Sequence, residues 1–525
     1  MTSRHVPAGA GNSGQSAHPR TDGIADMRAW VEWKASRSIC LVIAALFFVK
    51  FAAFGLYLTP FWDVPDESGH YSYVENLSHG SLPVLGEARI TRDVTDSWIG
   101  PGAHQGKNWI AQHPPLFYAL SAPVVAGVRA LGGDFDAQVH SARLVSALIG
   151  AFAILGLMAF LTIATGRSLL GIAGGVFVGA TPMFTQLGSG VTHDTLVACT
   201  AAWACYWFAR WLDSDKFSHV LSCALVVGLC CITKMTGLAL AIPLFLWIAL
   251  RLLKTRGRLM RPSWSTIVRV GIVWLVMFTP LILWMVRNLL HFHQVLPDAR
   301  LLNVYPEIPT EMGFFEYMRR YPLWQNVLLN FVALIGWMGT VPGTVVTVQA
   351  NGFIARAYVA VFLFCSSLAI LHTFRLLREG KREWACVATL AVVTVLLGST
   401  MSTYRFATIA CIVIFVATTW IGLGNLHALR KPSAHSWLML AGCFCILFFS
   451  VLYYHRIWDG YTQYGRVKAL HGRYFYPVMP FLALLMLWPL RKRVLSVAAV
   501  AVAALALIVS DGFFLHDAFV MYGRF

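Results

Sequence analysis

ICLVIAALFFVKFAAFGLYLTPFWDVPDESGHY, the stretch from Ile39 to Tyr71, is the part of the chain from which its architecture follows. The first part, 39–61, is apolar and long enough to cross a bilayer as a helix. The second part, 62–71, follows at once and holds three carboxylates and a histidine, in a chain of which 12% of the residues are charged. This order predicts a membrane span that is followed directly by an acidic cluster at the membrane surface.

A short helix is predicted in the second part, with Pro65 as its first residue and its end just before Gly80. Proline suits the first helical position, and glycine commonly follows the last one. Asp66 and Glu67 then lie in the first turn, where the helix dipole favours anions, and His70 can share their face. The alternative is that this acidic turn only starts a helix and has no chemical role.

The composition is that of a polytopic membrane protein. Hydrophobic residues make up 58% of the 525 residues, and apolar runs long enough to span a bilayer recur from end to end. The net charge of +17 does not indicate nucleic-acid binding, because the basic residues cluster at the ends of the apolar runs, as the positive-inside rule describes. All 11 cysteines lie in apolar segments, so neither a disulfide framework nor a metal-thiolate spacing is visible.

The apolar runs and the charge rule predict an all-α membrane protein with about 13 transmembrane helices, the N-terminus inside and the C-terminus outside. A long first outer loop, 62–140, follows the first span. The predicted divisions are a disordered cytoplasmic tail, a first membrane module that includes this loop, an outer loop with a re-entrant or interfacial segment, and a C-terminal set of membrane helices. In that order they cover 1–38, 39–290, 291–352 and 353–525.

Two apolar segments do not fit a simple span. The apolar stretch that follows Tyr118 and runs to about Leu131 is short and contains Pro123, so we expect a helix in or near the membrane interface. The stretch 326–348 is broken by three glycines and a proline. If it crossed the membrane, the basic cluster at 375–382 would lie outside, against the charge rule, so a re-entrant or interfacial segment is predicted.

This topology gathers ionisable side chains from distant segments on the outer face. Isolated charges at a membrane are costly and tend to be functional. Carboxylates that face a rim of cations suit an anionic, phosphate-bearing lipid substrate. The candidates are Asp66, Glu67, His70, His113, Asp194, Lys234, Arg287 and Arg473.

These residues carry a resemblance that covers nearly the whole chain after residue 38. The chain resembles the C superfamily of membrane glycosyltransferases, which includes the bacterial aminoarabinose transferases and the protein O-mannosyltransferases, and in particular a bacterial branch with a PDE-x-x-H motif in the first loop. The motifs are Pro65-Asp66-Glu67 with His70-Tyr71, the block His113-Pro114-Pro115-Leu116-Phe117-Tyr118, the Asp194 loop, Arg287-Asn288, and Gly472-Arg473-Tyr474 before the last pair of spans.

The resemblance implies an integral glycosyltransferase of the bacterial inner membrane with its active site on the outer face. It would transfer a sugar, with inversion, from a polyprenyl-phosphate carrier to a glycan, lipid or protein acceptor. Asp66, as base or as positioner of acceptor or metal, would act with Glu67 and Asp194. The expected substrate-binding residues are His70, Tyr71, His113, Lys234, Arg287, Asn288, Arg473 and Tyr474.

No cofactor is certain from the resemblance, and a divalent metal stays open, with Asp66, Glu67 and His113 as its candidate ligands. Relatives in the aminoarabinose branch have an acid–lysine pair where this chain has Gln112-His113, so His113 is equally well a loop histidine. Asp194 is equally an N-cap, and Lys234 equally an interfacial lysine.

Two other functions fit the same composition. A transporter or flippase of a lipid-linked sugar would place charges at mid-depth in several spans and repeat its halves, and neither pattern is present in the sequence. A non-catalytic membrane scaffold would not need Asp66 and Glu67 to face a basic pocket. Convergence of the outer acids and arginines on one site is therefore the structural test.

Overall fold

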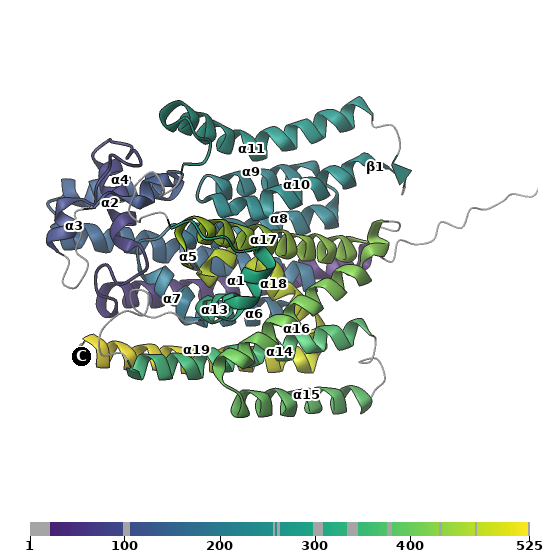
Figure 1. Cartoon of the computed structure of the whole chain (residues 1–525). Helices are drawn as coiled ribbons and strands as arrows, with labels where there is room; N and C mark the ends of the chain where they lie inside the picture. The colour runs from purple at the N-terminus through teal and green to yellow at the C-terminus, as the bar shows by residue number, and fades with distance from the viewer. Residues whose placement is uncertain are drawn as a thin grey trace, which may run out of the picture.

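The computed structural model describes residues 22–97, 106–255, 258–259, 263–297, 308–332, 345–374, 381–429, 433–467 and 470–522. Apart from the small antiparallel pair β1 and β2, the elements in these ranges are helices (Figure 1). The long bundle helices are α1 (Asp22–Ala53) with its π-helical continuation η1 (Phe54–Leu58), α5 (Phe135–Thr165), α6 (Ser168–Ala180), α7 (Pro182–Ser189), α8 (Asp194–Ser214), α9 (Phe217–Cys231), α10 (Leu238–Leu253), α11 (Trp264–Phe292), α14 (Val345–Thr373), α15 (Lys381–Thr400), α16 (Thr403–Gly424), α17 (Ala434–Tyr464), α18 (Met479–Leu487) and α19 (Arg493–Tyr522).

Shorter elements connect the bundle helices. They are α2 (Glu67–Ser78), α3 (Arg92–Asp96), η2 (Trp109–Gln112), α4 (Leu116–Ala130), η3 (Met235–Gly237), β1 (Lys254–Thr255), β2 (Arg258–Leu259), α12 (Phe314–Arg320), α13 (Leu323–Val332), η6 (Leu426–Leu429), η7 (Gly472–Val478) and η8 (Trp488–Leu490).

The structure confirms an all-α polytopic membrane protein. Among the described residues, ten helices are long and apolar enough to cross a membrane, or eleven if α6 and α7, bent by 71° at their junction, form one broken span. The predicted number of about 13 is not confirmed. Of the remaining predicted spans, α8 is absent from this set although it is 21 residues long, and α9 has only 15 residues.

The N-terminal boundary was predicted wrongly in part. Helix α1 begins at Asp22, so 22–38 is helical where a disordered tail was expected; 1–21 lies outside the described residues. The extension is held by packing, because Trp33 is buried and its ring centroid lies 6.5 Å from that of Tyr206. The carboxylate of Glu32 also accepts a hydrogen bond of 2.9 Å from the Ser168 hydroxyl.

Two of the predicted loop helices are present. Helix α2 ends at Ser78, just before Gly80 with φ +81°, as predicted, but it begins at Glu67 and not at Pro65, because Asp66 has a left-handed conformation. Helix α4 ends at Ala130 as expected but begins earlier, at Leu116. For the segment 326–348, α13 ends at Val332 and 333–344 lies outside the described residues. Its re-entrant or interfacial path therefore stays a prediction.

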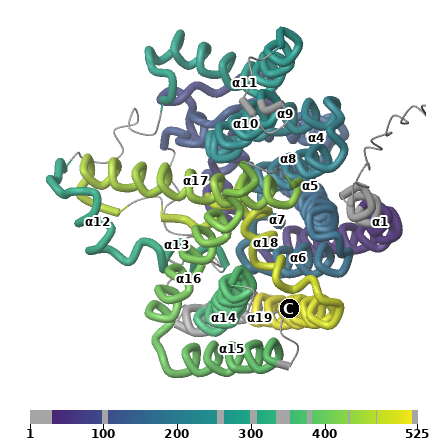
Figure 2. Tube along the Cα trace, turned by 90° about the vertical axis from the view of Figure 1, so that its right-hand side faces the viewer, coloured from purple at the N-terminus to yellow at the C-terminus, as the bar shows by residue number. Residues whose placement is uncertain are grey.

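Helix α5 lies at the centre of the bundle and contacts α1, α6 and α8, an arrangement that Figure 2 shows end-on. Small residues allow these helices to approach closely, as is common in membranes. At Gly156 of α5, for example, an added Cβ would lie 2.8 Å from the indole nitrogen of Trp203 in α8. Through these contacts α5 fixes the positions of α1, α6 and α8 relative to one another.

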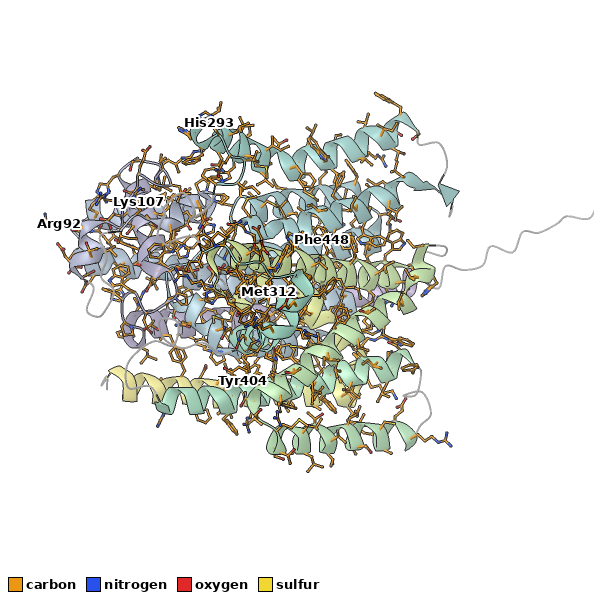
Figure 3. All side chains as sticks on the ribbon, viewed as in Figure 1. Arg92, Lys107, His293, Met312, Tyr404 and Phe448 are labelled. Carbon is orange, nitrogen blue, oxygen red and sulfur yellow. The ribbon has the colours of Figure 1, made fainter. Side chains whose placement is uncertain are left out.

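Helices α2, α3 and α4 cover one end of the bundle, and β1 lies at the other end (Figure 1). Arg92, Lys107 and His293 lie toward the covered end (Figure 3). Because successive bundle helices run back and forth, the start of α8, the end of α9 and the start of η7 all come to the covered end. Residues far apart in the sequence can meet there.

Candidate functional site

Asp66 lies at the junction between the first span and α2 in an unusual backbone conformation. Its φ is +65° and its ψ +10°, a left-handed geometry that only a few per cent of non-glycine residues adopt and that Asp tolerates better than most. The carboxylate accepts a hydrogen bond of 2.5 Å from Arg473 Nη2 at Oδ2 and one of 3.1 Å from Trp109 Nε1 at Oδ1. Its side chain keeps 30% of its accessible surface. Such strained residues concentrate at functional sites.

Arg473 reaches Asp66 from η7 and is almost fully buried. Its Nη1 lies 3.4 Å from the Pro65 carbonyl oxygen, and its Nε lies 3.6 Å from Asp194 Oδ2. The preceding Gly472 permits this approach, because an added Cβ would lie 2.1 Å from the Phe331 nitrogen in α13. One arginine therefore links the carboxylates of the first loop and of the Asp194 loop.

Asp194 and Lys234 complete a chain of alternating charges. Lys234 Nζ lies 2.6 Å from Asp194 Oδ1, and both side chains are buried. The same ammonium group lies 4.5 Å from the centroid of the Tyr474 ring, a cation–π distance. We call Asp66, Arg473, Asp194 and Lys234 the charge cluster. Its two anions and two cations balance, which buried charges require.

Three histidines and a tyrosine lie against the charge cluster. The Tyr118 hydroxyl lies 2.9 Å from His70 Nδ1 and 2.8 Å from His193 Nδ1. A hydroxyl has one proton, so one of these neutral rings accepts from it and the other donates to it. His193 Nε2 lies 3.5 Å from Asp194 Oδ1, and the His113 and His193 ring centroids are 4.5 Å apart. This network joins α2, α4 and the start of α8.

The electrostatics keep Asp66 charged and His70 neutral. Burial would raise the pKa of Asp66, but the charge of Arg473 and the hydrogen bond that Arg473 donates hold that pKa well below its ordinary value. Burial lowers the pKa of His70 to about 3, against the attraction of Asp66 and Asp194. At neutral pH the site therefore presents a carboxylate beside an uncharged imidazole.

Glu67 does not join the charge cluster, contrary to expectation. It is fully buried, and Arg143 of α5 binds it through Nε and Nη2, each at 2.8 Å. Its oxygens also accept the backbone N–H groups of Trp62 and Val191, each at 2.9 Å. Both oxygens are thus occupied and the side chain is fully buried, so the structure does not place Glu67 with Asp66 at the charge cluster. Its ion pair holds the first loop to the bundle.

Tyr71 is the second correction. It is fully buried on the face of α2 turned away from the charge cluster, with the rings of Trp62 and Phe135 at centroid distances of 5.7 Å. Since successive helical positions differ by about 100°, Tyr71 cannot share the direction of Asp66 and His70. Tyr71 therefore packs the loop and has no contact with the charge cluster.

Arg287 and Asn288 lie near the site, at the end of α11, without a described contact to the charge cluster. Arg287 Nη1 donates to Asn288 Oδ1 at 3.2 Å, and its guanidinium lies 4.7 Å from the Trp284 ring centroid. Phe292 of the same helix packs in a cluster with Trp109, which donates to Asp66. The end of α11 therefore contacts the site through Trp109.

The candidate metal ligands do not form a binding site. Glu67 is fully engaged by Arg143, and Asp66 is neutralised by Arg473. Over the described part of the chain, no group of three or more His, Cys, Asp or Glu side chains is arranged to hold a metal ion. The donor set required for a divalent ion is therefore not met by Asp66, Glu67 and His113.

Three residues that the sequence reasoning did not single out belong to this region: Arg143, Trp109 and Tyr118. Arg143 carried a usable signal, because a cation at the start of an apolar span is costly and usually has a partner. Tyr118 lies within the His113–Tyr118 block that carried the resemblance. Trp109 gave no signal in the sequence, and it begins the short 3-10 helix η2 of the first loop.

One family model matches part of the chain. Residues 112–284 match the family described as dolichyl-phosphate-mannose-protein mannosyltransferase. The matched segment runs from the His113 block through Asp194 and Lys234 to Trp284 and thus holds half of the charge cluster. No match was found among curated proteins.

Solved structures give more distant similarities. The Saccharomyces cerevisiae protein O-mannosyltransferase Pmt1–Pmt2 complex bound to the sugar donor is 18% identical over 51% of this chain and 37% of its own, with a TM-score of 0.35. The Archaeoglobus fulgidus oligosaccharyltransferase complex with Zn and sulfate is 13% identical, covering 90% and 53%, at 0.43. ArnT from Cupriavidus metallidurans bound to undecaprenyl phosphate is 13% identical, covering 87% and 77%, at 0.33. This chain thus covers only part of the length of the first two structures. Similarities this distant carry no argument about individual residues.

Proposed function

We propose that this chain is a glycosyltransferase of the C superfamily that takes its sugar from a polyprenyl-phosphate carrier. It transfers the sugar to an acceptor of the bacterial cell envelope, at the outer face of the inner membrane. The observation that carries the proposal is the charge cluster, in which carboxylates and cations from four distant segments meet at the covered end of the bundle. A scaffold has no need of such convergence, whereas transfer from a lipid phosphate needs both a base and cations.

Asp66 is the proposed base because it is ionised and is the most exposed acid of the charge cluster. The acceptor hydroxyl oxygen attacks the anomeric carbon on the side opposite the phosphate, and its proton passes to the Asp66 carboxylate. The bond between the anomeric carbon and the phosphate oxygen breaks, and polyprenyl phosphate leaves with the electron pair. The anomeric configuration is therefore inverted.

Arg473 and Lys234 are the proposed source of positive potential for the departing phosphate. Both are buried, where charge–charge interactions are less screened than in water. Arg473 also keeps Asp66 ionised at neutral pH and thus able to accept a proton, but the same interaction makes the carboxylate a weaker base. Asp194 is proposed to fix the two cations rather than to take the proton, since it lies between them.

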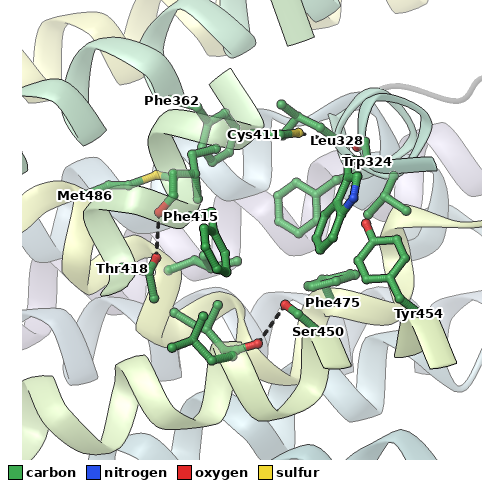
Figure 4. Close-up of a pocket in the computed structure, with 16 residues that line it drawn as sticks. Trp324, Leu328, Phe362, Cys411, Phe415, Thr418, Ser450, Tyr454, Phe475 and Met486 are labelled. Carbon is green, nitrogen blue, oxygen red and sulfur yellow. Dashed lines mark hydrogen bonds between the residues drawn. The ribbon is translucent and has the colours of Figure 1, made fainter. Parts of the chain in front are cut away.

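An apolar groove beside the site suits the polyprenyl tail. It has a volume of about 100 Å³ and is lined by residues of α13, α14, α16, α17, η7 and α18 (Figure 4). Phe475 lines it only two residues after Arg473, while Trp324, Phe415 and Met486 form other parts of its wall (Figure 4). The groove is smaller than a typical ligand pocket, so only the part of the tail nearest the phosphate is proposed to lie in it, with the phosphate toward the charge cluster.

The test is a transfer assay with purified protein, radiolabelled polyprenyl-phosphate sugars and an envelope acceptor fraction. Asp66→Asn should lower the rate of transfer by about 10²–10⁴-fold, the usual contribution of a general base. Asp96→Asn, at an exposed ion pair with Arg92, is the matched control and should leave the rate unchanged. Equal rates for wild type and Asp66→Asn would remove Asp66 as the base. Movement of labelled lipid between leaflets without transfer would favour the flippase.

A further inference from the structure

A second cavity, which unlike the apolar groove is lined by charged residues, lies at the opposite end of the bundle from the charge cluster. It has a volume of about 450 Å³, larger than the apolar groove. We call it the basic pocket, and it is lined by Arg167, His372, Glu383, Trp384, Val387, Trp488, Pro489, Arg491, Lys492 and Leu495. Helix α18 separates η7, which carries Arg473, from η8, which carries Trp488, so the basic pocket takes no part in the site described above.

The charges of the basic pocket are unbalanced. Lys492 and Glu383 form an ion pair and neutralise each other. Within the described residues, the Arg167 guanidinium makes no ion pair or hydrogen bond, and Arg491 has no acidic partner. Arg167 and Arg491 line the same cavity, and burial together with the charge of Arg167 lowers the pKa of Arg491 to about 10. Two arginines that line one cavity and have no acidic partner among the described residues suit the binding of an anion.

Aromatic and apolar groups complete the basic pocket. The Arg491 guanidinium lies 3.5 Å from the Trp488 ring centroid, and its Nε donates to the Trp488 carbonyl oxygen at 3.1 Å, so its direction is fixed. Val387 and Leu495 line the basic pocket and also pack on the buried cluster around Leu170 and Leu368. The basic pocket therefore has cationic residues at its rim and apolar residues at its floor, which favours an amphipathic ligand over a free anion.

We propose that the basic pocket binds the phosphate group of an anionic membrane phospholipid, with Arg167 and Arg491 on the phosphate and the lipid chain over Val387 and Leu495. Basic pockets between membrane helices on the cytoplasmic side are suited to anionic headgroups. The basic pocket lies at the end where α10 leads into the hairpin that holds Lys254 and Arg258, the end that the charge rule assigns to the cytoplasm. The proposal is independent of the proposed sugar transfer.

The experiment uses the purified full chain in detergent and measures bound lipid by native mass spectrometry. Phosphatidylglycerol is the anionic probe, phosphatidylethanolamine the zwitterionic one, and inorganic phosphate the free anion. Wild type should retain phosphatidylglycerol over phosphatidylethanolamine. Arg167→Gln and Arg491→Gln should each weaken phosphatidylglycerol binding about fivefold, as expected for one lost cation near an anionic surface. Arg382→Gln, exposed and adjacent to the basic pocket but not lining it, is the matched control and should bind as wild type does.

Arg167→Gln keeps the test decisive because this side chain makes no described hydrogen bond or ion pair, so its replacement should not disturb folding. Equal phosphatidylglycerol binding by wild type and Arg167→Gln would overturn the proposal. So would an equal loss in Arg382→Gln, which would show only a general charge effect. Displacement of the lipid by millimolar inorganic phosphate would overturn the assignment to a lipid headgroup.

Discussion

At the scale of the residue, Asp66 and Glu67 are neighbours in the sequence with opposite surroundings. Asp66 is partly exposed and pairs with Arg473 in the charge cluster, whereas Glu67 is fully enclosed with Arg143. Arg143 also donates to the carbonyl oxygens of Gly55, Thr59 and Pro60 at 2.6–2.7 Å. The Arg143 guanidinium thereby binds the free carbonyl groups at the end of the first span and holds in place the loop that contains Asp66. The two acids should respond differently to the same substitution.

Glu67→Gln should destabilise the fold by about 3–5 kcal/mol, because it leaves the Arg143 charge buried without its partner. Asp66→Asn should lower the rate of transfer by about 10²–10⁴-fold. It should destabilise the fold less than Glu67→Gln does, because the Asp66 side chain is 30% exposed and Arg473 keeps Asp194 as a second anion. Thermal unfolding in detergent, measured beside the transfer assay, separates the two effects. A double change, Glu67→Gln with Arg143→Met, should recover part of the lost stability. A Glu67→Gln protein with wild-type stability and no transfer would return Glu67 to the catalytic residues.

The buried histidines predict a pH dependence of stability. Burial lowers the pKa of His70 to about 3 and those of His113 and His193 well below 6.5. The unfolded chain takes up a proton on each histidine near pH 6.5, whereas the folded chain does not, so folding stability should fall as the pH drops below about 6.5. Asp66 acts in the same direction only at lower pH, near and below the ordinary Asp pKa of 3.8.

The measurement is the unfolding temperature between pH 7 and pH 4.5 for wild type and His70→Asn. The variant has one fewer buried histidine, so its unfolding temperature should change less over this range. His293→Asn is the control, because His293 is exposed and its left-handed backbone suits asparagine. A slope for His70→Asn as steep as that of wild type would show that His70 does not contribute.

At the scale of the element, η7 delivers Arg473 to Asp66 only because Gly472 allows η7 to lie against α13. A Cβ there would lie 2.1 Å from the Phe331 nitrogen and 2.2 Å from the Val327 carbonyl oxygen, both backbone atoms that cannot yield alone. Gly472→Ala should therefore displace η7, weaken the Arg473–Asp66 pair and lower the rate of transfer at least about tenfold, as misplacement of a catalytic group does.

Gly460→Ala in α17 is the matched control for Gly472→Ala. No atom lies within 4 Å of a Cβ added there, so the change should be neutral or slightly stabilising in a helix. Transfer rate and unfolding temperature are measured for both variants. Unaltered transfer by Gly472→Ala would show that the contact between η7 and α13 does not set the position of Arg473.

The helices and the site residues differ in how well they could be predicted from the sequence. A helix that ends before Gly80, an apolar helix that ends near Leu131 and the bundle were predicted from proline, glycine and apolar patterns, whereas the starts of the two helices, at Glu67 and Leu116, were not. The meeting of Asp66, Asp194, Lys234 and Arg473 was predicted as a shared membrane face, because each residue could be assigned to a span end. The separation of Glu67 and Tyr71 from that group could not be predicted. It depends on the left-handed turn at Asp66 and on Arg143, which is 76 positions away from Glu67.

At the scale of the whole molecule, the bundle separates two chemically different ends. Helix α8 begins at Asp194 in the charge cluster and ends at Ser214, and 21 helical residues rise about 30 Å, close to the thickness of the hydrocarbon core of a bilayer. Residues just beyond α8 should therefore lie on the other side of the membrane from the site. Since basic residues are retained in the cytoplasm, the end with Lys216 and Arg251 is the expected cytoplasmic end.

Cysteine labelling in intact cells tests this orientation. Asp96 in α3, near the covered end, and Lys216, after α8, are both exposed, whereas the native cysteines are buried or half-buried. A membrane-impermeant maleimide should label Asp96→Cys in cells whose inner membrane is intact, and should label Lys216→Cys only after that membrane is permeabilised. The unsubstituted chain gives the background. The reverse pattern would place the charge cluster in the cytoplasm, where an acceptor of the cell envelope could not reach Asp66.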